Sequence, residues 1–359
     1  MKAYKVVGII SIAAALGLSA CSGGSSGDPA GNGGSADSGT ITLLAYSGIF
    51  QDNYQAAVVE PFQKKYPNIK VKYQAGKSSA ENLAALQASK DRPNVDVAIM
   101  DVSVSNTGNK SGIFANLDPS LVPNAADVDS RGKNAEGYGP AVTYDSLVTI
   151  YNDNVNPAPT SWDALWDPKH AGRVIVTAHP DIQGTSLMLI ENAKAGGTIA
   201  DVSKGVAKLK QLAPAVQTFA PQPDQYTLVQ AGQADMAIAW NARAQTYADK
   251  SGGKLKVAIV SDKSVFQINT INLVKGSGNS KAAQTFINYA LSPEAQAKFT
   301  ETMFYAPTNT KAKPSAQALA RTSADPALVK NILDVDWNQV ASKRDQWTQL
   351  WRRDIISGS

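Results

Sequence analysis

The sequence predicts an α/β protein made of two lobes, and three observations lead to this fold class. The chain has 359 residues, more than one hydrophobic core usually organises. Short apolar runs alternate with stretches of helical periodicity, as expected of βαβ units around a mostly parallel sheet. Residues 235–274 hold three apolar runs bordered by polar side chains, and polar residues at strand ends are how an open α/β sheet presents a ligand site.

The composition is that of a globular protein with little excess charge. Apolar residues make up 43% and charged residues 18%, which argues against global disorder and against several membrane spans. The formal charge is +4, and Lys2 and Lys5 contribute two of those charges. The remainder is nearly neutral and contains no basic run of five residues, so we expect no nucleic-acid partner.

The N-terminus has the pattern of a secretory signal. A basic start is followed by the apolar run Val6–Leu16 and the small-residue context Leu18–Ala20, directly before Cys21. Leu-Ser-Ala-Cys resembles the bacterial lipobox, in which the cysteine is diacylated. We therefore predict a signal peptide over residues 1–20, lipidation of Cys21 and a Gly/Ser-rich tether over residues 21–39. The alternative is a plain signal peptide with an incidental cysteine.

The first part of the globular body reads as strand, helix, strand, helix, strand. Apolar side chains recur at helical spacing in both helical stretches, and serines stand where the second helix would begin. Consecutive units of this kind form parallel sheets with right-handed connections. The expected strands are Ile41–Tyr46, Ile69–Tyr73 and Val95–Met100, and the expected helices are Asp52–Tyr66 and Ser79–Ser89.

The rest of the chain continues the alternation. A long strand with period-two apolar residues is followed by a Pro-rich break, a second strand and several helices. Ser292 followed by proline is a helix-start signal. The expected elements are strands at Pro140–Tyr151 and Arg173–Thr177, helices at about 182–195, Lys204–Leu212 and Ser280–Ala290, a helix from Ser292, and a helical tail over Pro326–Trp351.

Two strands are predicted to cross between the lobes, one near Val142–Leu147 and the other near Gln267–Asn272. These crossings divide the body into segments that return to the first lobe late in the sequence. The predicted division is lobe 1 at residues 40–143 with 271–308, lobe 2 at 144–270, and C-terminal helices at 309–359 that pack across the lobes.

Several motifs together resemble the substrate-binding proteins of bacterial ABC importers, nearest to the spermidine/putrescine-binding branch. Beside the lipobox, these are Ser161–Pro168 (SWDALWDP), the step Ala239-Trp240-Asn241, and Ala290–Ala295 (ALSPEA). The resemblance covers about Ile41 to Trp351. It implies a periplasmic-binding-protein type II fold, with two α/β lobes that close on a ligand in the cleft between them. It also implies delivery of the solute to a membrane permease with its ATPase subunits.

The resemblance leaves the ligand open. Trp240 matches a tryptophan wall of the polyamine branch, and Asp181 lies near a carboxylate of that branch. However, the second crossing strand has Gln267 and Asn269 where that branch has Trp and Asp, and a desolvated ammonium needs a counter-charge. Arg243 offers a two-pronged donor suited to a carboxylate or phosphonate. A polyamine-like amine, an amino-acid-like zwitterion and a small organic anion bound by Arg243 are therefore all candidates.

Each of these residues also has a plain structural interpretation. Arg243 is equally consistent with an ion pair to Asp235 or Asp249, Trp240 with core packing, and Asp181 with a helix cap. Thr185 lies near a predicted helix N-terminus, where backbone N–H groups favour an anion. The predicted ligand site consists of Tyr46, Ser47, Asp101, Asp181, Thr185, Trp240, Arg243, Asn269 and Tyr305.

Other functional classes lack their signatures. Ferric-ion binders of this family place adjacent tyrosines where Ala242 and Arg243 stand, and the spacing of His170 and His179 fits no common zinc motif. There is no P-loop, no dinucleotide-binding glycine motif after a strand and no nucleophile elbow, so we expect no enzyme and no cofactor. The predicted protein is a monomeric, lipid-anchored solute receptor on the outer face of a bacterial membrane, with a signalling lipoprotein as a further alternative.

Overall fold

The computed structural model describes residues 38–322, 324–326 and 328–358. The predicted signal peptide, Cys21 and nearly all of the predicted tether lie outside these residues. Among the helices described, none combines the length and the apolar composition needed to cross a bilayer.

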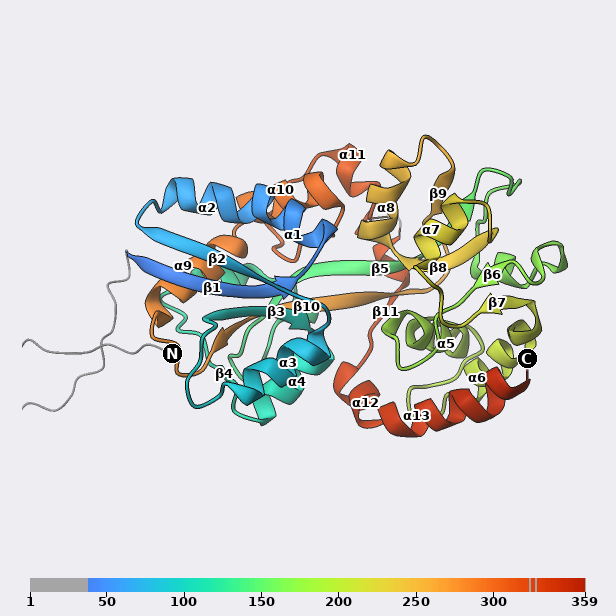
Figure 1. Ribbon diagram of the computed structural model, residues 1–359, viewed down its shortest axis with the longest axis horizontal. Helices are drawn as coiled ribbons and strands as arrows, with labels where there is room; N and C mark the ends of the chain where they lie inside the picture. Colours follow the sequence, from blue (N-terminus) through green and yellow to red (C-terminus); the bar gives the residue numbers. More distant parts are fainter. Residues whose placement is uncertain (1–37, 323, 327, 359) are drawn as a thin grey trace, which may run out of the picture. The chain divides into compact units, whose positions relative to one another are not determined.

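Paired strands connect two groups of parallel strands (Figure 1). Their order is β2-β1-β3-β10-β5-β8-β6-β7, and the short strands β4, β9 and β11 pair at the sides of β10 and β5. In chain order the strands are β1 (Gly39–Tyr46), β2 (Ile69–Gly76), β3 (Val97–Asp101), β4 (Phe114–Ala115), β5 (Ala141–Asn152), β6 (Val174–Ile175), β7 (Val216–Thr218), β8 (Met236–Trp240), β9 (Leu255–Ala258), β10 (Ser264–Val274) and β11 (Ile332–Leu333).

Strands β5 and β10 run side by side between the two groups (Figure 1). They pair with each other in antiparallel fashion, and β10 pairs with β3 while β5 pairs with β8. We call the part built on β1, β2 and β3 lobe 1 and the part built on β6, β7 and β8 lobe 2. The two predicted crossing regions, Val142–Leu147 and Gln267–Asn272, fall within β5 and β10.

Helices flank the strands in both lobes, and several begin at a capping side chain. Ser78 accepts a hydrogen bond from the backbone of Glu81, and Ser292 does the same for Ala295, as predicted for N-caps. The helices are α1 (Ile49–Tyr54), α2 (Glu60–Lys65), α3 (Ser79–Ala88), α4 (Val102–Lys110), α5 (Ile182–Lys194), α6 (Ser203–Leu212), α7 (Gln225–Gln230), α8 (Asn241–Lys250), α9 (Ser280–Ala290), α10 (Pro293–Met303), α11 (Ala316–Leu319), α12 (Trp337–Ser342) and α13 (Arg344–Leu350).

Each lobe has apolar cores on both faces of its strands. In lobe 1, one core contains Phe50, Phe286 and Phe299, and the other contains Leu83 and Phe114. The cores of lobe 2 are built in the same way, one around Trp162, Leu187, Met236 and Trp351, the other around Ile150, Tyr226 and Leu255. This burial on both faces explains the continuous apolar runs of the strands.

Three local predictions need correction. The helix expected at Asp52–Tyr66 runs from α1 to α2 with a π-helical stretch at Gln55–Val59 between them, and Pro61 then falls in the first turn of α2, where its missing N–H is tolerated. The segment Ser161–Pro168, whose sequence predicts one or two helical turns capped by Ser161, forms short 3₁₀ turns, and the Ser161 side chain makes no capping hydrogen bond. The tail over Pro326–Trp351 is not helical throughout, because β11 pairs with β10 before α12 begins.

The C-terminal segment contacts both lobes. Trp337, Trp347 and Trp351 are buried in a core of lobe 2. Helix α12 also packs beside α4 of lobe 1, where Asn106 Nδ2 donates a hydrogen bond to Asn338 Oδ1 (2.8 Å).

Candidate functional site

The ends of β1 and β3 meet the crossing strand β10 at a row of polar side chains. Asp101 of β3 lies opposite Asn269 of β10 in the antiparallel ladder. Tyr46, at the end of β1, donates a hydrogen bond from Oη to Asn269 Oδ1 (2.8 Å), and Asn269 Nδ2 donates to Thr143 Oγ1 (3.0 Å). The structure thus brings together three of the predicted site residues, Tyr46, Asp101 and Asn269.

Ser79 links this row to the beginning of α3. Its Oγ lies 2.8 Å from Tyr46 Oη and accepts a hydrogen bond from the backbone N–H of Asp101 (3.0 Å). The starts of α3 and α4 are therefore fixed to the ends of β1 and β3 by side chains, and these form the lobe 1 wall of the candidate site.

Asp101 is a buried carboxylate at the start of α4, with 5% of its surface exposed. Its Oδ1 accepts hydrogen bonds from the backbone N–H and the hydroxyl of Ser103, at 2.9 and 2.6 Å. Burial raises the pKa of Asp101, and the hydrogen bonds from Ser103 oppose that rise. Its negative charge also faces Tyr46, whose pKa is raised by burial and by Asp101.

A second buried carboxylate, Asp145 of β5, holds the start of α8. Its Oδ1 accepts hydrogen bonds from the backbone N–H groups of Ala242 (3.0 Å) and Ser146 (2.8 Å). Oδ2 is buried and has no hydrogen-bond partner in the described part of the chain. Burial raises the pKa of Asp145 to about 7, although the hydrogen bonds from Ala242 and Ser146 and the charge of Arg243 lower it.

Arg243 lies one turn into α8, exposed to solvent but with protein groups around it. Burial by these groups would lower the pKa of Arg243, whereas Tyr226, Tyr305 and Asp145 raise it, and the net shift is upward. Tyr305, buried beside Arg243 and Asp145, is also close enough to Tyr46 for the two phenols to influence each other. Arg243 therefore lies near Tyr226, Tyr305 and Asp145, and Tyr305 connects this group to Tyr46 of the lobe 1 wall.

The structure contains neither of the ion pairs considered for Arg243. Asp235 is paired with His170 and Arg173, at 2.8 and 2.6 Å, and Asp249 is paired with Arg321 at 2.8 Å. Neither carboxylate binds Arg243, and among the described residues its guanidinium takes part in no ion pair. Its charge is available to a ligand.

Asp181 and Trp240 each have a structural contact and also keep part of the side chain accessible to solvent. Asp181 caps α5, since its Oδ1 accepts from the N–H of Gln183 (2.7 Å) and the hydroxyl of Thr177 (3.2 Å). Its side chain is nevertheless exposed. Its charge also affects the pKa of Tyr226, as the charge of Arg243 does. Burial raises the pKa of Tyr226, Arg243 lowers it, and Asp145 and Asp181 raise it.

The side chain of Trp240 is half-buried against a core of lobe 2. Its backbone N–H donates to Tyr226 Oη (3.2 Å). Core packing therefore explains the buried part of the Trp240 side chain and leaves the rest of it accessible.

Two predicted residues stand apart from this group. Thr185 is fully buried, and its hydroxyl donates to the carbonyl of Asp181 (2.8 Å) and contacts His179 Nδ1 (2.7 Å). Its hydroxyl is thus occupied by the turn that begins α5. Ser47 is exposed, and its backbone N–H donates to the carbonyl of Gly76 (3.0 Å).

Sequence reasoning missed Asp145, Tyr226 and Ser79. A signal for Asp145 was present, because it is the one acidic side chain in the apolar strand Ala141–Asn152, all of which is buried. Tyr226 and Ser79 carried no such signal, since an isolated tyrosine on a helix and a serine at a helix start are common structural residues.

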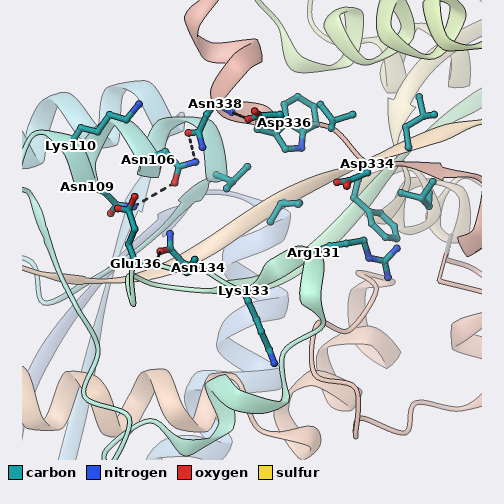
Figure 2. Close-up of a pocket in the computed structure, with 18 residues that line it drawn as sticks. Asn106, Asn109, Lys110, Arg131, Lys133, Asn134, Glu136, Asp334, Asp336 and Asn338 are labelled. Carbon is teal, nitrogen blue, oxygen red and sulfur yellow. Dashed lines mark hydrogen bonds between the residues drawn. The ribbon is translucent and has the colours of Figure 1, made fainter. Parts of the chain in front are cut away.

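A polar pocket of about 370 Å³ lies elsewhere, between α4, β10 and the segment that follows β11 (Figure 2). Asn106 and Asn338 face each other in it, and Arg131, Lys133 and Asp334 line its other side (Figure 2). None of the predicted site residues lines it. A search of the described residues for three or more His, Cys, Asp or Glu side chains able to hold a metal ion finds none.

Two α/β lobes joined by crossing strands, with charged and phenolic side chains at the ends of strands in both, define a two-lobed solute receptor. Residues 57–330 match the family model of bacterial extracellular solute-binding proteins, and the chain belongs to this family. It is the solute-binding, non-enzymatic component of an ABC uptake system and acts on the extracellular or periplasmic side of the membrane. The predicted fold class is confirmed.

Known relatives agree with this assignment. The chain is 28% identical over 284 residues to a γ-aminobutyric acid-binding protein of Pseudomonas aeruginosa, which covers 76% of this chain and 78% of the relative. An ABC transporter structure from Clostridium perfringens shares 27% identity with a TM-score of 0.71, over 88% of this chain and 99% of that one. A spermidine/putrescine-binding protein of Streptococcus pneumoniae has the same fold at 16% identity and a TM-score of 0.72, over 88% and 100%.

Proposed function

We propose that this protein captures a small zwitterion, an amino acid of the γ-aminobutyrate type, and delivers it to the permease of its ABC system. The observation that carries the proposal is the exposed Arg243, which has no ion-pair partner among the described residues and acts, like the exposed Asp181, on the phenol of Tyr226. The γ-aminobutyric acid-binding protein of Pseudomonas aeruginosa, at 28% identity, supports the same solute class.

Arg243 is the proposed partner of the ligand carboxylate. A guanidinium presents parallel N–H donors that match the two oxygens of a carboxylate. Tyr226 and Tyr305 lie near Arg243 and are phenols, so among the described residues Asp145 is the carboxylate that could compete with a ligand for it. Asp145 is buried and already accepts two backbone hydrogen bonds, so it can hold α8 in place without neutralising Arg243.

Asp181 of lobe 2 and Asp101 of lobe 1 are the proposed counter-charges of the ligand ammonium. Asp181 is exposed, and its Oδ2 is not used in the cap of α5. Asp101 stands across the cleft beside Tyr46. An ammonium bound between carboxylates of different lobes makes its full set of contacts only when the lobes approach, so binding shifts the population toward the closed state.

The polyamine and anion alternatives use only part of this arrangement. A polyamine would have to bind beside the fixed positive charge of Arg243, and at Asn269 it would meet an amide already engaged by Tyr46 and Thr143. A dicarboxylate or phosphonate would use Arg243 but would be repelled by Asp181. A zwitterion is the solute class for which all three charged groups are favourable.

The test is a thermal-shift screen of the purified full chain with γ-aminobutyrate, putrescine and succinate. A ligand at a hundred times its dissociation constant stabilises the folded state by about 2.7 kcal/mol. We expect γ-aminobutyrate to raise the melting temperature, and Arg243→Ala and Asp181→Asn each to abolish the rise. Arg352→Ala, an exposed arginine near the C-terminus, is the matched control. A response to putrescine alone would reject the zwitterion in favour of the polyamine branch, and a response to succinate alone would favour an anion.

We further propose that the predicted domain division, with lobe 1 at 40–143 and 271–308 and lobe 2 at 144–270, describes the two bodies that close on the solute. A lipid on Cys21 would hold this monomeric receptor near its permease and ATPase. Cys21→Ala should release the protein from membranes into the soluble fraction. Retention of the variant on membranes would count against the anchor.

A further inference from the structure

We propose that the ligand carries an apolar arm next to its ammonium group, and that this arm occupies a pocket between α3, α4, α5 and α12. The ligand would then be a γ-amino acid with an apolar substituent on the carbon that bears the nitrogen. The inference rests on the proposed function, because it places the ammonium between Asp101 and Asp181. The pocket has a volume of about 230 Å³.

The pocket begins where the candidate site ends. Ser79 is the first residue of α3, Asp101 is the N-cap of α4 and Asp181 is the N-cap of α5. The first turn of each helix also lines the pocket. Ala80 comes from α3, Ser103 from α4 and Ile182 from α5. Because the pocket wall starts next to both aspartates, we place in this space a substituent attached beside an ammonium that they hold.

Among the polar side chains of the wall, those of Ser103, Thr107, His179 and Thr185 already have partners. Ser103 Oγ donates to Asp101 (2.6 Å), and Thr107 Oγ1 donates to the carbonyl of Ser103 (3.2 Å). The two ring nitrogens of His179 lie 2.7 Å from Thr185 Oγ1 and 2.8 Å from the carbonyl oxygen of Arg344. An apolar occupant therefore deprives none of these groups of a hydrogen bond.

The remaining wall is apolar and large enough for a substituent of several carbons. An apolar cavity of about 150 Å³ is known to take benzene, so a pocket of about 230 Å³ has room for a phenyl group. The exposed side chains at its rim include Gln87 and Arg344. Its apolar lining consists of Ala80, Leu83, Ala84, Val104, Pro180, Ile182, Val340 and Ala341.

The walls come from both lobes. Helices α3 and α4 belong to lobe 1, α5 belongs to lobe 2, and α12 belongs to the C-terminal segment that contacts both. An arm in this pocket gains its contacts only while the lobes are together. It would therefore strengthen the closed state in the same way as the proposed charge contacts.

The test compares γ-aminobutyrate with three derivatives substituted at carbon 4, namely 4-aminopentanoate, 4-aminohexanoate and 4-amino-5-phenylpentanoate. Dissociation constants for the full chain would be measured by isothermal titration calorimetry. Each buried methylene is worth about 0.8 kcal/mol, which is about fourfold in affinity. We expect affinity to rise in this order and the phenyl derivative to bind at least about tenfold more tightly than γ-aminobutyrate.

Two neighbouring alanines of α3 provide a matched pair of variants. Both alanines are exposed, but Ala84 lines the pocket and Ala85 does not. Ala84→Trp should remove the gain of the phenyl derivative and change γ-aminobutyrate binding less than about twofold, while Ala85→Trp should change neither. Ala341→Trp fills the pocket from α12 and should act like Ala84→Trp.

The outcomes separate this inference from the proposed function. If γ-aminobutyrate binds but the substituted compounds bind no more tightly, the apolar arm is wrong and the zwitterion site stands. If the phenyl derivative keeps its gain in both pocket-filling variants, its arm lies elsewhere and the assigned pocket is wrong. If no γ-amino acid binds, the proposed function fails and the inference fails with it.

Discussion

Arg321 and Asp249 form an ion pair of 2.8 Å that joins the turn after α11 to the last turns of α8. Arg321 Nε also donates to Gln245 Oε1 (2.9 Å), and Asn241 Nδ2 donates to the carbonyl of Arg321 (2.8 Å). Asn241, Gln245 and Asp249 lie four residues apart and thus form one stripe along α8. The helix that presents Arg243 to the cleft is therefore held to the same segment along its length.

This stripe predicts that Arg321 sets ligand affinity more than fold stability. The guanidinium also lies 3.7 Å from the ring centroid of Phe304, directly before Tyr305 of the candidate site. Because Arg321 and Asp249 are partly exposed, Arg321→Ala should lower the free energy of unfolding by only about 1 kcal/mol. We expect ligand affinity to fall by about tenfold as α8 loses its support. Calorimetry and urea unfolding would measure the two effects, and an unchanged affinity in the variant would contradict the prediction.

The buried carboxyl group of Asp145 should make the folded protein less stable as the pH rises from about 4 to about 7. Burial raises its pKa from 3.8 to about 7 in the folded protein. The folded state therefore keeps a proton that the unfolded chain releases, and the free energy of unfolding falls as the pH rises through this window, by at most about 1.4 kcal/mol per pH unit. Asp145→Asn keeps the hydrogen-bond acceptor for Ala242 but removes the titration. Urea unfolding of the variant should lose this slope, and an unchanged slope would show that another group is responsible.

The buried ring of His179 should have the opposite effect on stability, because it should make the folded protein less stable as the pH falls below 6.5. Burial and the charge of Arg344 lower the pKa of His179, while its hydrogen bond to the Arg344 carbonyl raises it, and the net shift is downward from 6.5. The folded state then prefers the neutral ring, so stability from this group is present above pH 6.5 and is lost as the pH falls through the lowered pKa. Compared with wild type, His179→Gln should gain unfolding free energy at pH 5 relative to pH 8, with the contribution of Asp145 common to both proteins. The absence of this relative gain at pH 5 would refute the assignment.

The sequence was a good guide to the fold because burial leaves a pattern. The strands that became β1, β3, β5 and β8 are mostly apolar, and Ser292 marks a helix start by its local chemistry. The site was harder to predict, because its geometry depends on long-range pairing. Nothing local indicates that Tyr46 reaches Asn269, or that Thr185 turns inward to His179 while Asp181 stays exposed.

Arg243 offers a test of geometry against charge. Lysine would keep the positive charge in the cleft but would lose the parallel pair of donors that a carboxylate accepts. We expect Arg243→Lys to weaken γ-aminobutyrate binding by about tenfold or more and to retain some binding, whereas Arg243→Ala abolishes it. The variants should match wild type in urea unfolding. Full affinity in Arg243→Lys would mean that only charge matters at this position.

Truncation of Trp351 should show how much the C-terminal segment contributes to the stability of lobe 2. Its side chain is fully buried in the core that also contains Trp162 and Met236, and truncation of a buried aromatic side chain costs about 3–5 kcal/mol. Trp351→Ala should therefore destabilise lobe 2 by about that amount in urea unfolding. Because Trp351 belongs to a core of lobe 2 and not of lobe 1, the loss should appear as earlier exposure of α5 and α6 in hydrogen exchange. Arg352→Ala, the exposed neighbour, should leave both measurements unchanged. Equal loss of protection in β1 and β3 would instead show that the two lobes unfold as one unit.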